Sequence, residues 1–220
     1  MEIIVFLSIV IAVLAVLTSI VLVRRVKKQI AEMTDVLVDV KNGNGNRRIL
    51  SATNELTAPL AYEINEIVVA YESRLSTVRQ LFFTCGLIDY IARKTKNIRA
   101  DIVNQLGKER LEKIYDLADV YHCDNIERVS DDFIEEAQIG IGTFDNVGEC
   151  KYSIPSHWDI GKVYKRLIKQ VAKYENISII DALIKVYNSF ISTKIDDYNS
   201  SVYYENPSCI FESYKENKML

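Results

Sequence analysis

The stretch Ile3–Val23 reads IIVFLSIVIAVLAVLTSIVLV and contains no charged residue, no proline and no glycine. An α-helix rises about 1.5 Å per residue, so a helix over this stretch spans about 30 Å, the thickness of a bilayer hydrocarbon core. The sequence that follows is charged and compatible with water. The stretch therefore predicts one transmembrane helix, which we place in residues 1–25, ahead of a cytoplasmic chain.

Charges on the two sides of the stretch predict its orientation. Only Met1 and Glu2 precede it. Four cations follow it almost directly: Arg24, Arg25, Lys27 and Lys28. By the positive-inside rule, we expect the N-terminus outside the plasma membrane and the rest of the chain in the cytoplasm. A cleaved signal peptide would need a basic leading region, a shorter apolar core and a small-residue cleavage site, which this stretch lacks. We therefore expect an uncleaved single-pass anchor without an extracellular sensor domain.

Composition narrows the classes of partner and cofactor. The net charge is −3 over 220 residues, whereas a nucleic-acid-binding domain is usually strongly basic, so we expect no nucleic-acid partner. Four cysteines are widely spaced, without a CxxC pair or a Cys/His cluster: Cys85, Cys123, Cys150 and Cys209. This spacing is typical of reduced cytosolic thiols, and we predict neither a metal site nor a cofactor.

Two segments after the anchor carry apolar residues at heptad spacing, in residues 26–40 and from residue 55 onward. The positions that we predict to form a helix-pairing seam are Ile30, Met33, Leu37, Ile64, Ile67, Tyr71, Leu75 and Val78. A Gly- and Asn-rich turn at residues 41–46 separates the segments, and Ile49 and Leu50 are available to pack back onto the helices. An ordinary amphipathic helix in a monomeric core has the same spacing. We favour paired helices, and hence a homodimer, because a segment beside the membrane has little else to pack on.

The stretch GNGNRRILSATNELTAPLAYEINEIVVAYESRL, residues 43–75, resembles the juxtamembrane part of short-anchor sensor histidine kinases from Gram-positive bacteria. Together with the anchor, the resemblance covers about residues 1–80 and includes a HAMP-type linker. It implies a parallel dimer that relays rotation or displacement of its helices. Asn54 stands where the histidine of a phosphoacceptor box would be, and the chain has no Asn-rich ATP box and no DxGxG lid. We therefore predict a HAMP-like linker in residues 26–80 without a kinase core.

Residues 81–220 predict a small all-helical cytoplasmic domain, which makes the whole chain mainly α. Helix starts are indicated by Ser156 with Asp159, by Ser178 with Asp181, and by Asn206-Pro207. We also expect Ser130 to open a helix and Gly107 to end one. The longest irregular stretch is Ile139–Pro155, and it suggests a sub-boundary near residues 140–155.

Three stretches of this region, FFTCGLIDYIARKTKN, YHCDN and VYNSFISTKIDDYNSSVYYENPS, resemble small helical domains of unknown function from Firmicutes. That resemblance implies no activity. Proteins with such domains sometimes lie near toxin–antitoxin-like genes, which suggests an alternative function.

Few residues suggest chemistry. His122 lies at a predicted helix end and His157 in a first helical turn, and such positions are typical of structural histidines. Adjacent carboxylates, such as Asp131/Asp132, Glu135/Glu136 and Asp196/Asp197, point in different directions on a helix, so we interpret them as solvated. Cations recur along one predicted helix at Lys162, Lys165, Arg166, Lys169 and Lys173. They could meet anionic lipid or an acidic partner, but a solvated helix face is the simpler interpretation.

We therefore predict a non-enzymatic, membrane-anchored signalling or interaction protein with an unidentified cytoplasmic protein partner. The alternative is a toxin–antitoxin or defence-associated membrane protein whose helical domain binds a partner protein. A third hypothesis is an enzyme of unrecognised type that uses His122 or His157.

Overall fold

The computed structural model describes residues 2–42, 44, 47–49 and 57–220. Within these ranges the chain forms helices and no strand, which confirms the expected mainly α fold. The elements are α1 (Glu2–Lys41), α2 (Ala58–Thr95), α3 (Arg99–Asp116), α4 (Ala118–Tyr121), α5 (Ile126–Glu136), α6 (His157–Glu175), α7 (Ile179–Tyr187), α8 (Phe190–Asp196), the 3-10 helix η1 (Val202–Tyr204) and α9 (Pro207–Glu216). The chain divides into two compact units, Met1–Ser76 and Thr77–Leu220, hereafter unit 1 and unit 2. Helix α2 contributes residues to both.

Helix α1 is long and apolar enough to span a membrane, judged by length and composition. Its apolar side chains along Ile3–Val23 are exposed, as expected of a surface meant for lipid. Among the described residues, no other helix meets both conditions.

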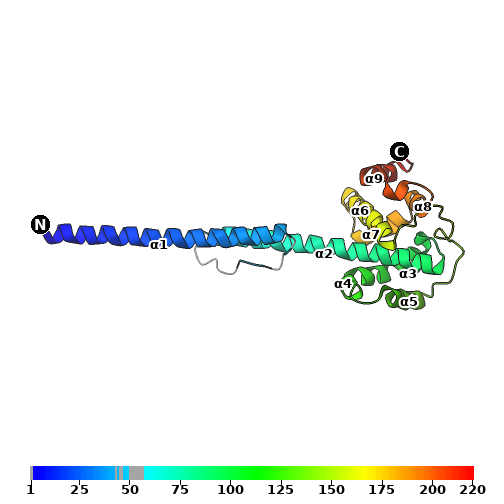
Figure 1. Cartoon of the computed structure of the whole chain (residues 1–220), viewed down its shortest axis with the longest axis horizontal. Coiled ribbons are helices and arrows are strands. Elements are labelled where there is room, and N and C mark those ends of the chain that lie inside the picture. The colour runs from blue at the N-terminus through cyan, green and yellow to red at the C-terminus, as the bar shows by residue number, and fades with distance from the viewer. Residues whose placement is uncertain (1, 43, 45–46, 50–56) are drawn as a thin grey trace. The chain divides into compact units, whose positions relative to one another are not determined.

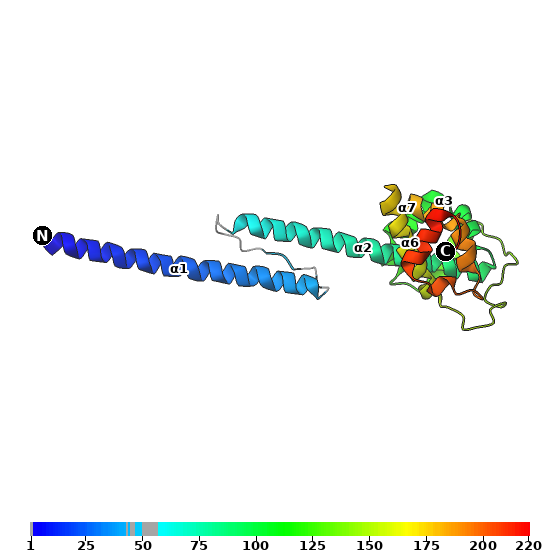
Figure 2. The same ribbon diagram turned by 90° about the horizontal axis from the view of Figure 1, so that it is seen from above.

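Unit 1 contains two helices that lie side by side and run in the same direction (Figure 2). Thr57, just before α2, donates a hydrogen bond to the side chain of Gln29 on α1 (2.8 Å). From there a shared apolar cluster runs along both helices, formed by Met33, Val36, Val40, Ile49, Ala61, Ile64 and Val68. Two parallel helices need a long connection, because the chain must return from the end of the first helix to the level at which the second begins. Residues 42–57 form this connection.

Part of that connector is fixed on α2. The side chain of Asn65 accepts a hydrogen bond from the Ile49 N–H (3.0 Å) and donates one to the Ile49 carbonyl (3.1 Å). Arg48 forms an ion pair with Glu72 (2.5 Å). Ile49 is buried in the cluster, so its expected packing is confirmed, whereas Leu50 and half of the predicted turn at residues 41–46 lie outside the described residues.

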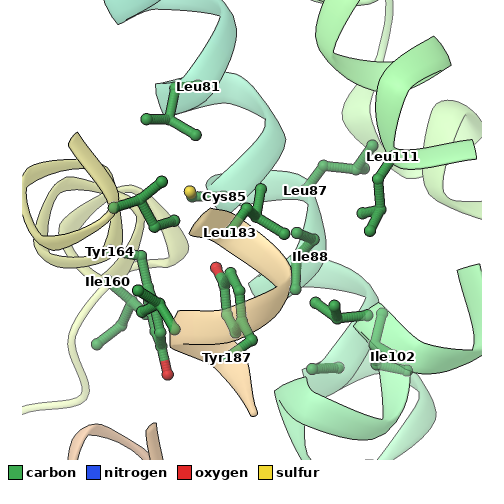
Figure 3. Close-up of a cluster of buried hydrophobic side chains, with 14 of the residues drawn as sticks. Leu81, Cys85, Leu87, Ile88, Ile102, Leu111, Ile160, Tyr164, Leu183 and Tyr187 are labelled. Atoms are coloured by element: carbon green, nitrogen blue, oxygen red, sulfur yellow. The ribbon is translucent and has the colours of Figure 1, made fainter. Parts of the chain in front are cut away.

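Unit 2 is built around the last part of α2, which helices α3 to α9 surround (Figure 1). Figure 3 shows Leu81, Cys85 and Ile88 of α2 among side chains of α3, α6 and α7. These residues are fully buried, and burial of one Leu or Ile side chain contributes about 1.5–3 kcal/mol. Residues on both sides of the irregular stretch 139–155 share this one core.

Local signals set most helix ends in unit 2. Ser156 and Asp159 form the predicted capping box of α6, and the Ser178 side chain accepts the Asp181 N–H at the start of α7. Asn206 and Pro207 open α9 as expected. Gly107 interrupts α3 with φ +71°, a backbone conformation that suits glycine, so the expected break is confirmed.

One expected helix start is wrong. Helix α5 begins at Ile126, where the side chain of Asn125 accepts the Glu127 N–H. Ser130 lies inside the helix, buried, and donates to the Glu127 carbonyl. The earlier start lets both Val129 and Phe133 reach the core.

Candidate functional site

The predicted seam in unit 1 is divided between two surfaces. Met33 of α1 and Ile64 of α2 are buried in the cluster that these two helices share. In contrast, Ile30, Leu37 and Ile67 are 50%, 43% and 55% exposed. The heptad pattern therefore includes apolar residues that the contact between α1 and α2 does not bury.

The exposed positions of both helices lie on the same side of the pair. On α1, Ile30 and Leu37 each follow a buried residue, Gln29 or Val36, by one position. On α2, the exposed Leu60 and Ile67 each precede a buried residue by one position, Ala61 or Val68. One position is about 100° of helix rotation. In two parallel helices that face each other, a residue one position after the contact on one helix and a residue one position before the contact on the other lie on the same side of the pair. We call the resulting surface, formed by Ile30, Leu37, Leu60 and Ile67, the apolar face of unit 1.

The remaining seam residues are partly buried. Tyr71 packs against the cluster of unit 1, Leu75 ends the seam in that unit, and Val78 already belongs to unit 2. The four membrane-flanking cations Arg24, Arg25, Lys27 and Lys28 are exposed on α1. This position suits contact with lipid headgroups.

Unit 2 holds a buried ion network that the sequence did not indicate. Arg99 is 2% exposed, donates from Nε to Asp89 Oδ1 (2.6 Å), and also contacts Asp196 and the Tyr198 hydroxyl. Arg93 pairs with the other oxygen of Asp89 (2.7 Å) and donates to the Pro155 carbonyl (2.8 Å). Burial is the largest single influence and by itself would lower the pKa of Arg99, but the Asp89 carboxylate together with the hydroxyls of Tyr198, Tyr164 and Tyr187 outweighs it, and the pKa is raised.

This network corrects one interpretation of the carboxylate pairs. Asp196 is not solvated: it is buried and bound to Arg99, whereas its neighbour Asp197 is exposed. Asp131 and Glu136, in contrast, are exposed and paired with surface cations, Asp131 with Lys94 (2.7 Å) and Glu136 with Lys113 (3.0 Å). The network contains two cations and two anions, so its charges balance, and it connects α2, α3 and α8. We therefore interpret it as structural.

His122 and His157 both lie next to Trp158. The rings of His157 and His122 lie 4.5 Å and 6.5 Å from the Trp158 ring, between centroids. Burial is the main influence that lowers the pKa of His157 below 6.5, and its buried Nε2 has no hydrogen-bond partner in the described structure. His122 is exposed. Within the described residues, no group of three His, Cys, Asp or Glu side chains could hold a metal ion.

The cysteines also differ in environment. Cys85 is fully buried in the core, where burial raises the pKa of its thiol to about 12. A thiol with so high a pKa is protonated at neutral pH and is not a nucleophile. Cys123 is exposed, and Cys150 and Cys209 are partly exposed, each as a free thiol.

The cations predicted on one helix lie on α6. Four of them, Lys162, Arg166, Lys169 and Lys173, recur at spacings of four, three and four and are exposed. Lys165 differs, because it is half-buried with its ammonium 5.0 Å from the Phe82 ring centroid. Burial, followed by the charges of Arg166 and Lys169, lowers the pKa of Lys165.

No family model, curated protein or solved structure matches this chain. The resemblances to sensor-kinase front ends and to small helical domains therefore stay predictions.

Proposed function

We propose that this chain is a single-pass, membrane-anchored signalling or interaction protein that works as a homodimer, with its basic side and unit 2 in the cytoplasm. The observation that carries the proposal is the apolar face of unit 1, which is coherent across two helices and left uncovered by a single chain. Water-exposed apolar residues at heptad spacing are the usual surface for pairing with another helix.

A second copy is the partner that this face fits best. Two parallel helices from each chain, facing each other across Ile30, Leu37, Leu60 and Ile67, would form a parallel four-helix bundle. Anchoring in one membrane places two copies in the parallel orientation and raises their effective concentration. The parallel packing of α1 and α2 and the attachment of Ile49 to Asn65 of α2 also support the HAMP-like interpretation of this segment.

Helix α2 offers a route for a signal. It begins in unit 1, where it lines the proposed bundle, and ends in unit 2 among the most buried residues of the chain. A change in how the four helices pack would therefore act directly on residues such as Leu81 and Cys85. In this proposal unit 2 is the output domain and acts by binding another protein.

The first prediction concerns the apolar face. Leu37→Glu together with Ile67→Glu should convert the full-length chain from dimer to monomer, because four buried carboxylates would meet in one bundle. The measurement is size-exclusion chromatography with light scattering in mild detergent, supported by cross-linking in native membranes through Ile67→Cys in a background without exposed cysteines.

Val38 and Val69 provide the matched control. They are 48% and 49% exposed on the same two helices, but their positions point away from the apolar face. Val38→Glu with Val69→Glu should leave the dimer intact. A wild-type chain that is monomeric in membranes, or a control that dissociates equally, would contradict the proposal.

A further inference from the structure

A groove opens on unit 2 between α6, the segment 153–155, η1 and the start of α9. Its volume is about 500 Å³, within the size range of ligand and peptide pockets. Apolar side chains form its floor, among them Val163, Leu167 and Ile210. Leu167 and Ile210 are nearly fully buried, so the floor is fixed by the core beneath it.

The charged side chains around the groove differ in whether they already have a partner within the chain. Asp159 is occupied by Ser156 and by Lys162 (3.1 Å), and Glu205 accepts a hydrogen bond from Ser201 (3.1 Å). Arg166 lines the groove, is exposed, and has no ion-pair partner within the described residues. Among the charged groups that line the groove, the guanidinium of Arg166 is thus available to a ligand.

A row of cations continues from the groove along α6. Arg166, Lys169 and Lys173 lie on one face of the helix, and the described part of the chain offers none of them an ion pair. At about 1.5 Å per residue the row extends about 10 Å beyond Arg166. The lowered pKa of the adjacent Lys165, caused by burial and then by Arg166 and Lys169, is consistent with a local excess of positive charge.

We propose that this groove and row of cations bind an acidic segment of a partner polypeptide. One apolar side chain of the partner enters the groove over Val163 and Ile210, and its carboxylates pair with Arg166, Lys169 and Lys173. Charge complementarity selects an anionic occupant. A concave, apolar-floored site favours a peptide over a flat lipid surface, because only a projecting side chain can fill the groove. The inference goes beyond the proposed dimer and does not depend on it.

The test uses the full-length chain in phosphatidylcholine nanodiscs and a library of random short peptides displayed on phage. Selected peptides should share an apolar residue flanked by Asp or Glu. For a synthetic peptide of the selected sequence, Arg166→Glu should weaken binding about tenfold or more, because repulsion replaces an ion pair. Val163→Trp should also weaken binding, because the indole would fill the groove.

Lys194→Glu is the matched control, since Lys194 is an exposed lysine on α8 away from the groove, and it should bind as the wild type does. Selected peptides without acidic residues, or binding that survives Arg166→Glu, would overturn the proposal. Lipid is distinguished by repeating the work in nanodiscs of equal phosphatidylcholine and phosphatidylglycerol. If Lys169 and Lys173 become protected there from amine acylation while no acidic peptide binds, the row docks on a membrane and the proposal is wrong. A monomeric chain that still binds the peptide would refute only the dimer.

Discussion

At the residue scale, Arg99 connects its own helix, α3, to α2 and α8. Its guanidinium is buried with two carboxylates and a tyrosine hydroxyl, which lie 10, 97 and 99 positions away in sequence. A buried ion pair gains little net free energy over apolar residues of the same size, but the loss of one partner is costly because the other charge remains buried. We therefore interpret the network as one that selects which helices meet more than it adds to stability.

Asp89→Asn is the prediction that follows. It leaves Arg93 and Arg99 with one carboxylate, Asp196, so we expect the free energy of unfolding of unit 2 to fall by about 3 kcal/mol or more. Trp158 is the chain's single tryptophan and lies in unit 2, so urea unfolding of the detergent-solubilised chain can be followed by its fluorescence.

Asp131→Asn is the matched control for that change. Asp131 also accepts an ion pair from a cation of α2, Lys94, but it is exposed, so its loss should cost less than about 1 kcal/mol. Equal losses for the two variants would show that the buried network contributes no more than a surface ion pair.

At the scale of the elements, α2 and α6 approach each other closely in unit 2. A Cβ built on Gly86 would lie 2.6 Å from the Trp158 ring, and one on Gly161 would lie 3.1 Å from the Gly86 backbone nitrogen. The contact gives the reason for a glycine at this position: the helices approach too closely for a side chain.

Gly86→Ala sets two effects against each other. Alanine favours a helix over glycine by about 1 kcal/mol, whereas overpacking of a core costs about 1–3 kcal/mol. Trp158 cannot move freely because Phe82 and His157 pack against it, so we expect the clash to dominate and the melting temperature to fall. Circular dichroism gives the measurement.

A second substitution tests that explanation. Trp158→Leu removes the ring that Gly86→Ala would strike, so in its background Gly86→Ala should cost less or even stabilise. A double-mutant cycle measures this coupling. If the effects of the two substitutions on stability are additive, contact with the Trp158 ring is not the reason for a glycine at position 86.

The elements also show what the sequence could predict. Caps at Ser156, Ser178 and Asn206 were predicted because their partners lie two or three positions away. The start of α5 was missed because another local cap lies before Ser130: the side chain of Asn125 accepts the Glu127 N–H, and this earlier start places Val129 in the core. In unit 1 the heptad spacing indicated the apolar positions, but spacing alone does not separate residues buried between α1 and α2, such as Met33, from those left exposed, such as Leu37.

At the scale of the whole molecule, the sites that sequence did not reveal are those that unite distant segments. The groove combines α6 with η1 and α9, and the ion network combines α2, α3 and α8. Neither has a spacing signature, because each depends on how the helices fold together. The anchor, in contrast, is one continuous apolar run and the heptads are a regular spacing, so both are visible in the order of residues along the chain.

The last prediction concerns the independence of the two units. Every residue of the large apolar core lies between Leu81 and Ile210, and the ion network and the groove lie within unit 2 as well. A fragment of residues 77–220 should therefore fold without the anchor and without unit 1, give a helical circular dichroism spectrum, and unfold in one cooperative thermal transition. It should also be monomeric, because it lacks the apolar face of unit 1. A fragment that stays unfolded would mean that unit 2 needs unit 1 for its stability, whereas a folded fragment that dimerises would move the pairing surface out of unit 1.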